Sequence, residues 1–501
     1  MRARALKFNV IAGLLSEFFT LISGLILPRL ILTTFGSASN GLVSSIGQFL
    51  GFSIILRSGL GAVSRAALYK PIAEKNIEQI SSVMVATQSY MRKVAMMIAG
   101  YILSLAVLYP LIVKGEFEWG FVFTMVLVLG STTFADNFFG IKAIILLQAD
   151  QKYYIHTLSS LVSSIISFLI SVLLIKLNCS LLVVKCGATV GILFNPIILN
   201  IYVRKNYNIN WKAEKNNLAI KQRWSAFAQQ MATIINDNVD LVLLTFFVAL
   251  KEVSVYTVYF MIVNNIYKIV NSFTTGINST FGDMIAKKET DNLRKTFSFF
   301  EWGLFAMCAV VFAVTAIMIV PFIRIYTHSV EDVNYIRPLF AFAMTVAAML
   351  KCMKTPYQTI AEAAGRFKET RNSAIIEIIV NLVVSIMCLY FFGIIGVIIG
   401  TICASLYRIT DLIFFSYKNI LKIPIFYVLR TFLLYILVFL VVVVVAYFIK
   451  MPVASNYLTW ALWACVFLVG AVLIVVGVSV VNNRRQLAYL MDRIKRKRIK
   501  K

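Results

Sequence analysis

The sequence predicts an all-helical integral membrane protein with fourteen transmembrane helices, because its composition lies outside the range of soluble domains. Of its 501 residues, 60% are hydrophobic and only 14% are charged, whereas soluble domains carry about 25% charged residues. The mean hydropathy is +0.84. Apolar runs of about 20 residues, the length that crosses a bilayer, recur from end to end. Membrane β-barrels instead show alternating segments of roughly 10 residues, so we expect helices.

The apolar runs define the positions of the helices. The first run follows Arg2, Arg4 and Lys7, but it is too long for a signal peptide and lacks a small-residue cleavage site. We therefore expect a retained first helix. The fourteen predicted helices are 8–31, 39–61, 92–113, 119–146, 155–176, 180–203, 224–249, 254–282, 297–323, 337–361, 372–392, 394–416, 428–449 and 458–481.

Basic residues predict the orientation in the membrane. The formal charge of +26 comes from residues in short gaps between apolar runs, a pattern that does not favour a nucleic-acid partner. The positive-inside rule places both termini in the cytoplasm, and we expect the basic C-terminal tail to contact anionic lipids. The loops on the opposite side hold few basic residues: Lys114, Lys176, Lys251, Arg324, Arg337 and Lys450.

An internal repeat predicts two related halves. When the chain is shifted by 214 positions, Lys7 falls on Lys221 and the loop 151–153 falls on 365–367. A constant offset across several loops predicts six-helix lobes at 1–214 and 215–428, with a helix pair and basic tail at 429–501. Because each lobe has an even number of spans, we expect the lobes to form a V around a central cavity, with a symmetry axis along the membrane normal.

Motifs in the first third of the chain resemble those of a known family. They comprise Leu6–Asn9, Pro28-Arg29, Phe35–Leu42, Arg57–Asn76 and Leu147–Tyr153. With the helix arrangement, they resemble the polysaccharide flippases of the multidrug/oligosaccharidyl-lipid/polysaccharide exporter superfamily. Flippases of lipid-linked peptidoglycan precursors also resemble the chain and share fourteen helices, whereas drug antiporters of the superfamily usually have twelve.

The resemblance implies a substrate and a location. The substrate would be an isoprenyl (undecaprenyl) diphosphate carrying an oligosaccharide of an O-antigen or capsule, moved across the bacterial inner membrane. A polysaccharide polymerase is then an expected partner. Two alternatives stay open: a peptidoglycan lipid-precursor flippase and a cation-coupled multidrug exporter. A membrane-embedded glycan polymerase is disfavoured, because every predicted external loop is short.

Ionisable residues inside the predicted spans are the candidate functional residues, because charges are costly in a bilayer. Arg408 and Asp411 are three positions apart on one helix face and can pair with each other. Lys351 and Lys354 also share a face, but two like charges need a partner elsewhere. The other charged positions in the spans are Arg29, Arg57, Lys142, Lys185, Lys268, Glu17, Asp136, Asp237, Asp240 and Glu377.

A diphosphate needs cations, and we expect Arg29, Arg57, Lys268, Lys351, Lys354 and Arg408 to supply them. Asn264 and Asn271 share a helix face with Lys268 and are candidates for binding sugar hydroxyls. The resembling peptidoglycan flippases use arginines on helices one, two and eight. Arg29 and Arg57 match this pattern, while Lys268 departs from it. The structural alternative is that Arg57 and Lys268 are neutralised by Glu17 and Asp237 on neighbouring helices.

The sequence contains no pattern typical of an enzyme. It has no GxxxxGK[ST] motif, and neither its seven cysteines nor its two histidines form a metal-ligand spacing. We therefore expect no cofactor, no metal and no catalytic residue. Outward movement of an anion is favoured by the membrane potential alone. Coupling to protons or sodium through Glu17, Asp237 or Asp240 is the other option.

Overall fold

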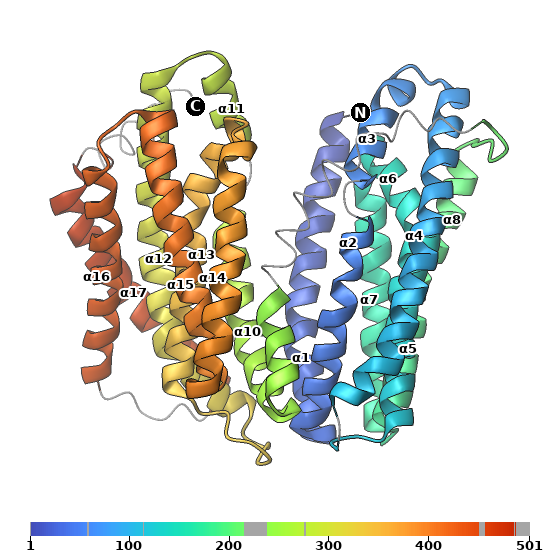
Figure 1. Cartoon of the computed structure of the whole chain (residues 1–501), viewed down its shortest axis with the longest axis horizontal. Coiled ribbons are helices and arrows are strands. Elements are labelled where there is room, and N and C mark those ends of the chain that lie inside the picture. Colours follow the sequence, from blue (N-terminus) through green and yellow to red (C-terminus); the bar gives the residue numbers. More distant parts are fainter. Residues whose placement is uncertain are drawn as a thin grey trace. The chain divides into compact units, whose positions relative to one another are not determined.

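The computed structural model describes residues 2–57, 60–113, 115–214, 238–274, 277–449, 456–484 and 486. These residues contain helices and connecting turns and no β-strand, which confirms the predicted all-helical fold class. The chain divides into two compact units, Met1–Ser254 and Val255–Lys501. Figure 1 shows long helices running beside one another within each unit.

The first unit begins with two helical segments that meet at Gly36. The φ of 81° and ψ of 172° at Gly36 are non-helical, and glycine adopts such angles without a steric cost. Gly36 lies in the motif Phe35–Leu42. The helices of the unit are α1 (Arg2–Gly51), α2 (Ser53–Arg57), α3 (Leu60–Ala73), α4 (Ile77–Ile112), α5 (Trp119–Ala135), the π-helical turn η1 (Asp136–Gly140), α6 (Ile141–Ala149), α7 (Tyr153–Lys176), α8 (Leu181–Asn206), Asn238–Phe247 and the first residues of α10 (Leu250–Ser272).

Small residues bring α7 and α8 into close contact. The Ser167 hydroxyl donates a hydrogen bond to the Ala188 carbonyl at 2.9 Å, and Gly191 packs directly against the backbone of Ser167. Apolar surfaces alone do not drive helices together in lipid, so close backbone approach and such hydrogen bonds hold them. The buried serines of α7 repeat every four residues along this contact: Ser159, Ser163, Ser167 and Ser171.

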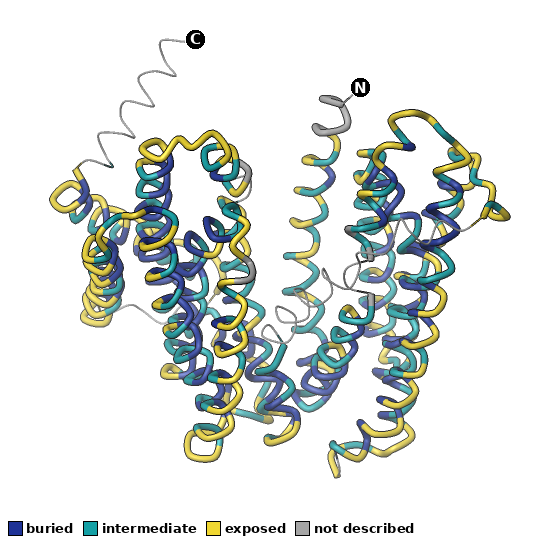
Figure 2. The backbone as a smooth tube through the Cα atoms, turned by 45° about the horizontal axis from the view of Figure 1, so that its top comes forward, coloured by how far each residue is buried: buried dark blue, intermediate teal, exposed yellow. Residues whose placement is uncertain are grey.

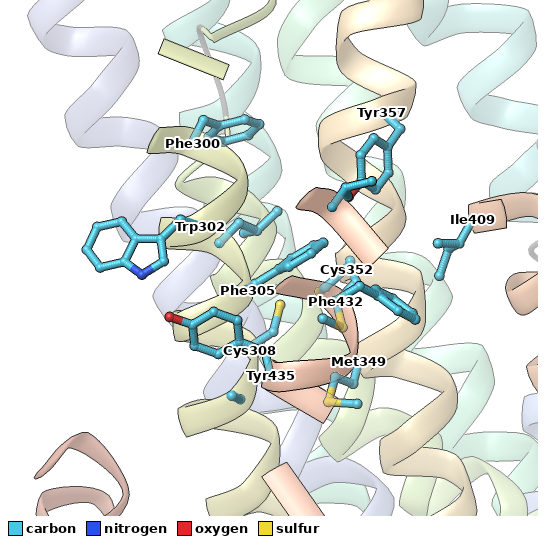
Figure 3. Close-up of a cluster of buried hydrophobic side chains, with 14 of the residues drawn as sticks. Phe300, Trp302, Phe305, Cys308, Met349, Cys352, Tyr357, Ile409, Phe432 and Tyr435 are labelled. Atoms are coloured by element: carbon cyan, nitrogen blue, oxygen red, sulfur yellow. The ribbon is translucent and has the colours of Figure 1, made fainter. Parts of the chain in front are cut away.

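The second unit has a core built mainly around α12. Figure 3 shows Phe305 of this helix beside Tyr357 and Phe432 of neighbouring helices, with ring centres 6.4 and 6.0 Å away. Phe300 and Trp302 of α12 belong to the same buried cluster. The elements of the unit are the rest of α10, α11 (Ile277–Ala286), α12 (Thr290–Tyr326), α13 (Pro338–Ala363), α14 (Phe367–Phe392), α15 (Ile394–Phe415), the π-helical turn η3 (Ser416–Leu421), α16 (Phe426–Phe448) and α17 (Tyr457–Asn482).

Twelve candidate membrane spans occur among the described residues. The longest, Phe8–Leu56, contains the predicted helix 8–31 and most of the predicted helix 39–61. The predicted helix 224–249 lies partly outside the described residues. The count of fourteen therefore stays a prediction. Large apolar side chains are exposed on many helices, most densely on α16 and α17. Figure 2 marks the exposed residues in yellow. Such a surface is suited to a bilayer, where lipid covers it.

Several helices extend beyond their predicted apolar runs. The helix predicted at 92–113 begins at Ile77, after Asn76, whose side-chain oxygen accepts a hydrogen bond from the Gln79 amide at 3.0 Å. The helix predicted at 297–323 begins at Thr290. Hydropathy detects only the part of a helix that lipid surrounds, so it misses polar extensions that carry their own capping residues.

The loop geometry repeats at nearly the predicted offset. Left-handed residues end helices at Lys75 and again at Lys288, 213 positions later, and at Gln151 and again at Gly365, 214 positions later. In each case the next residue's amide bonds to the carbonyl five positions before it, as in a Schellman motif. These recurrences support the division into 1–214, 215–428 and 429–501, which stays a prediction.

Candidate functional site

Four charged side chains meet inside the second unit, and we call them the charge cluster: Lys354 on α13, Glu377 on α14, and Arg408 and Asp411 on α15. The Lys354 ammonium donates to Glu377 Oε1 at 2.7 Å. Arg408 Nε lies 3.5 Å from Glu377 Oε2, and an Arg408 Nη lies 3.7 Å from Asp411 Oδ2. The cluster therefore contains two cations and two anions, and its formal charge is balanced.

The helices that carry the cluster pack closely. Glycines on α15 allow this, because a Cβ on Gly396 would meet the Cys388 backbone and one on Gly400 would meet Ser385. The side chains of Lys354, Glu377 and Arg408 are about nine-tenths buried. Burying charges is strongly unfavourable unless they are paired, so the three positions depend on one another.

Hydrogen bonds orient the buried guanidinium. An Arg408 Nη donates to the Thr370 carbonyl at 3.0 Å, near the start of α14. On α14, Asn381 lies one turn beyond Glu377 and accepts a hydrogen bond from Ser385 at 2.9 Å. One face of α14 is thus polar and buried along three turns, which confines Glu377 to the interface with α13 and α15.

The structure gives Lys351 and Lys354 different partners, although both lie on α13. Lys354 pairs with Glu377, whereas the Lys351 ammonium lies 5.0 Å from the ring centre of Tyr267 on α10. A cation over an aromatic face is attracted by the ring quadrupole. The expectation that these like charges need partners on other helices is met, and so is the pairing of Arg408 with Asp411.

The remaining sequence-predicted cations are distributed over both units. Arg29 is half-buried on α1. Arg57 is the last residue of α2, and its side chain is outside the described part of the chain. Lys268 is exposed on α10 between the half-buried Asn264 and Asn271, and no described residue forms an ion pair with it.

The two predicted coupling acids that the structure describes do not join the charge cluster. Glu17 is exposed on α1, and Asp240 is half-buried in the helix Asn238–Phe247. Asp237 lies outside the described residues. A buried acid that the sequence analysis did not include is Glu301 on α12. The sequence alone could have identified it, since it is an acidic residue near the start of the predicted apolar helix 297–323.

Comparison with solved structures identifies the fold. The lipid II flippase MurJ, in an inward closed conformation, aligns with a TM-score of 0.69 and 16% identity over 94% of this chain and 98% of its own. The chain has the fold of this transporter. A multidrug resistance MATE family transporter of the MOP superfamily aligns with a TM-score of 0.59 and 13% identity over 78% of this chain and 95% of its own.

A further MATE transporter, VcmN of Vibrio cholerae in its bent form, aligns with a TM-score of 0.53 and 14% identity over 84% of this chain and 98% of its own. No protein-family model and no curated protein matches the sequence. At these identities the alignments describe the arrangement of helices, and the side chains must identify the substrate.

Proposed function

We propose that this chain is a flippase that moves an isoprenyl (undecaprenyl) diphosphate-linked oligosaccharide from the cytoplasmic to the outer leaflet of the bacterial inner membrane. The observation that carries the proposal is the fold shared with the lipid II flippase over 94% of this chain and 98% of that one. The flipped oligosaccharide would be used for a surface polysaccharide such as an O-antigen or capsule, with a polymerase acting on it in the outer leaflet.

The distribution of charge supports an assignment of the diphosphate-binding residues. Lys354 and Arg408 are neutralised by Glu377 and Asp411, so little of their charge is available to a substrate. We therefore assign the diphosphate first to Arg57 and Lys268. An arginine fork suits phosphate geometry, and an ammonium acts as a point charge.

The polar face of α10 supports the assignment of the sugar-binding residues. Asn264, Lys268 and Asn271 are spaced by four and three positions and so share one face of the helix. Their amide groups can both donate and accept hydrogen bonds, as sugar hydroxyls require. In this proposal the sugar lies along this face while Lys268 holds the diphosphate.

The proposed transport needs no nucleotide. The inside-negative potential favours outward movement of an anion by about 2.3 kcal/mol per charge per 100 mV. A diphosphate with a charge of roughly −2 at neutral pH gains about twice that amount. An empty carrier that presents Arg57 and Lys268 would be drawn inward by the same field.

Alanine variants test the assignment. Arg57→Ala and Lys268→Ala should remain abundant in the membrane but abolish polysaccharide export, and lipid-linked oligosaccharide should accumulate in the cytoplasmic leaflet. Arg57→Lys should restore part of the activity, because it keeps the charge. Lys70→Ala is the matched control, since Lys70 is highly exposed and its one ion-pair partner among the described residues is the exposed Glu74. Full export from both well-expressed alanine variants would show that the diphosphate is held elsewhere.

The alternatives are distinguished by complementation. A peptidoglycan lipid-precursor flippase should sustain growth of cells depleted of their own lipid II flippase. A cation-coupled multidrug exporter should instead raise resistance to cationic drugs. The MATE structures cover 78% and 84% of this chain, compared with 94% for the flippase, so the flippase shares more of the helix arrangement.

A further inference from the structure

A second buried polar cluster lies in the unit that holds the charge cluster. Glu301 on α12 is only 4% exposed. The Tyr357 hydroxyl of α13 lies 2.8 Å from Glu301 Oε1. The Tyr417 hydroxyl of η3 lies 3.0 Å from Oε1 and 2.9 Å from Oε2. We call these three residues the carboxyl–tyrosine cluster.

Aromatic side chains enclose this cluster. Phe297 and Phe305 lie one helical turn on either side of Glu301, and their ring centres are 6.0 and 6.4 Å from that of Tyr357. Figure 3 shows Phe305 and Tyr357 in the apolar core. A carboxylate in such surroundings has lost its water, and two neutral hydroxyls replace only part of that solvation.

None of the ion pairs formed among the described residues includes Glu301. This distinguishes it from Glu377, which contacts both Lys354 and Arg408. A cation beside a carboxylate favours the ionised form strongly. Glu301 forms no ion pair with a cation in the described part of the unit, so no paired cation holds it in the ionised form.

Several other ionisable groups on and around α12 have partners of their own or are neutral. The helices and turns packed against α12 are α11, α13, α16, α17 and η3. From α16, the Tyr435 hydroxyl bonds to Ser479 of α17 at 2.9 Å. On α11, Asp283 pairs with Lys287 at 2.8 Å. Two turns before Glu301, Arg294 donates to the Leu421 carbonyl at 2.7 Å, and two turns beyond it Cys308 is a buried thiol.

Tyrosine hydroxyls make the cluster compatible with two charge states. A hydroxyl can donate to a carboxylate, and after rotation it can accept the proton of a carboxylic acid. The heavy atoms need not move, because both arrangements use the same short distances. Lysine or arginine in these positions could only donate and would lock the group in its ionised form.

We propose that Glu301, Tyr357 and Tyr417 form a proton-binding site whose occupancy drives the transport cycle. The inference rests on the proposed function for its link to transport. Glu301 accepts one proton in one state of the cycle to become a carboxylic acid, and releases it to water in the other. The lipid-linked anion moves outward in exchange, so the proton gradient adds to the effect of the membrane potential.

Infrared spectroscopy of the purified full-length protein tests proton binding without any substrate. A carboxylic acid and a carboxylate absorb at different frequencies, so a pH titration should show a band that converts from one to the other. Glu301→Gln should lose this band, while the amide keeps partners for both tyrosine hydroxyls. Glu74→Gln is the matched control, because that acid is exposed and has no proposed role in coupling, and it should leave the band unchanged.

Tyr417→Phe provides a second measurement that does not depend on how well Glu301→Gln folds. It removes the hydroxyl but keeps the ring, and it should move the pH at which the band converts by about one unit, because a hydrogen bond to the charged form is lost. A band unaffected by both substitutions would overturn the proposal. A band that responds to sodium and is insensitive to pH would also overturn it.

Export assays then separate this inference from the proposed function. In cells, export by the wild type should depend on external pH, and Glu301→Gln should lose that dependence. Unchanged pH dependence in a well-expressed Glu301→Gln variant would refute the coupling role. If no lipid-linked oligosaccharide is moved by the wild type at any pH, the proposed function fails, whereas the infrared titration still decides proton binding.

Discussion

The charge cluster makes a sharp prediction about Glu377. Glu377→Gln keeps the side-chain shape but removes the negative charge that faces Lys354 at 2.7 Å and Arg408 at 3.5 Å. Arg408 keeps Asp411 at 3.7 Å and the Thr370 carbonyl at 3.0 Å. The ammonium of Lys354 loses its only ion-pair partner among the described residues, so the loss of stability should arise mainly there.

The expected magnitude follows from these distances. With an effective dielectric constant of about 20, the attraction at these separations is about 6 and about 5 kcal/mol before the cost of desolvation. Removing one partner of a buried pair destabilises proteins by about 3–5 kcal/mol. Because Arg408 keeps its other contacts, we expect the lower value, about 3 kcal/mol. This corresponds to roughly a 100-fold smaller folding equilibrium constant, since about 1.4 kcal/mol is tenfold.

Denaturant and thermal unfolding of detergent-solubilised protein, followed by size-exclusion chromatography, measure this loss. Lys354→Met should cost less than Glu377→Gln, because Glu377 still pairs with Arg408. The double variant Lys354→Met/Glu377→Gln should recover part of the stability, since no ammonium is then stranded. The reasoning is refuted if Glu377→Gln has the same free energy of unfolding as the wild type. It is also refuted if the double variant loses more free energy of unfolding than the two single variants together.

Gly396→Val should destabilise the α14–α15 contact by about 1–3 kcal/mol, because the new side chain meets the Cys388 backbone. Gly470→Val is the control in unfolding measurements, because a side chain at Gly470 has open space beside it. Equal losses of stability in the two variants would contradict this account. Burial lowers the pKa of Lys152, but the hydrogen bond and charge of Asp150 outweigh it and raise the pKa overall. The pair therefore stabilises the protein at neutral pH and loses this effect as pH rises through the raised pKa, above the ordinary 10.5. Lys152→Met should weaken the decline in melting temperature at alkaline pH. The same dependence of melting temperature on pH in this variant and the wild type would contradict the prediction.

Hydropathy and charge in the sequence predicted the all-helical membrane class and most helix positions, because a helix in lipid must satisfy its own backbone and cover itself with apolar side chains. These requirements act within one segment. The pairing of Arg408 with Asp411 could be predicted for the same reason, since three positions along a helix bring two side chains together. The need of Lys354 for an outside partner was also visible, but the partner was not.

Only the tertiary structure decided which residues meet across helices. Glu377 reaches Lys354 from another helix, and Glu301 meets Tyr357 and Tyr417, which are 56 and 116 positions away in the sequence. Helix rotation and depth depend on close packing and hydrogen bonds, because lipid solvates any apolar face equally well. A pattern within a single segment does not contain this information, and for this reason the carboxyl–tyrosine cluster became visible only in the folded chain.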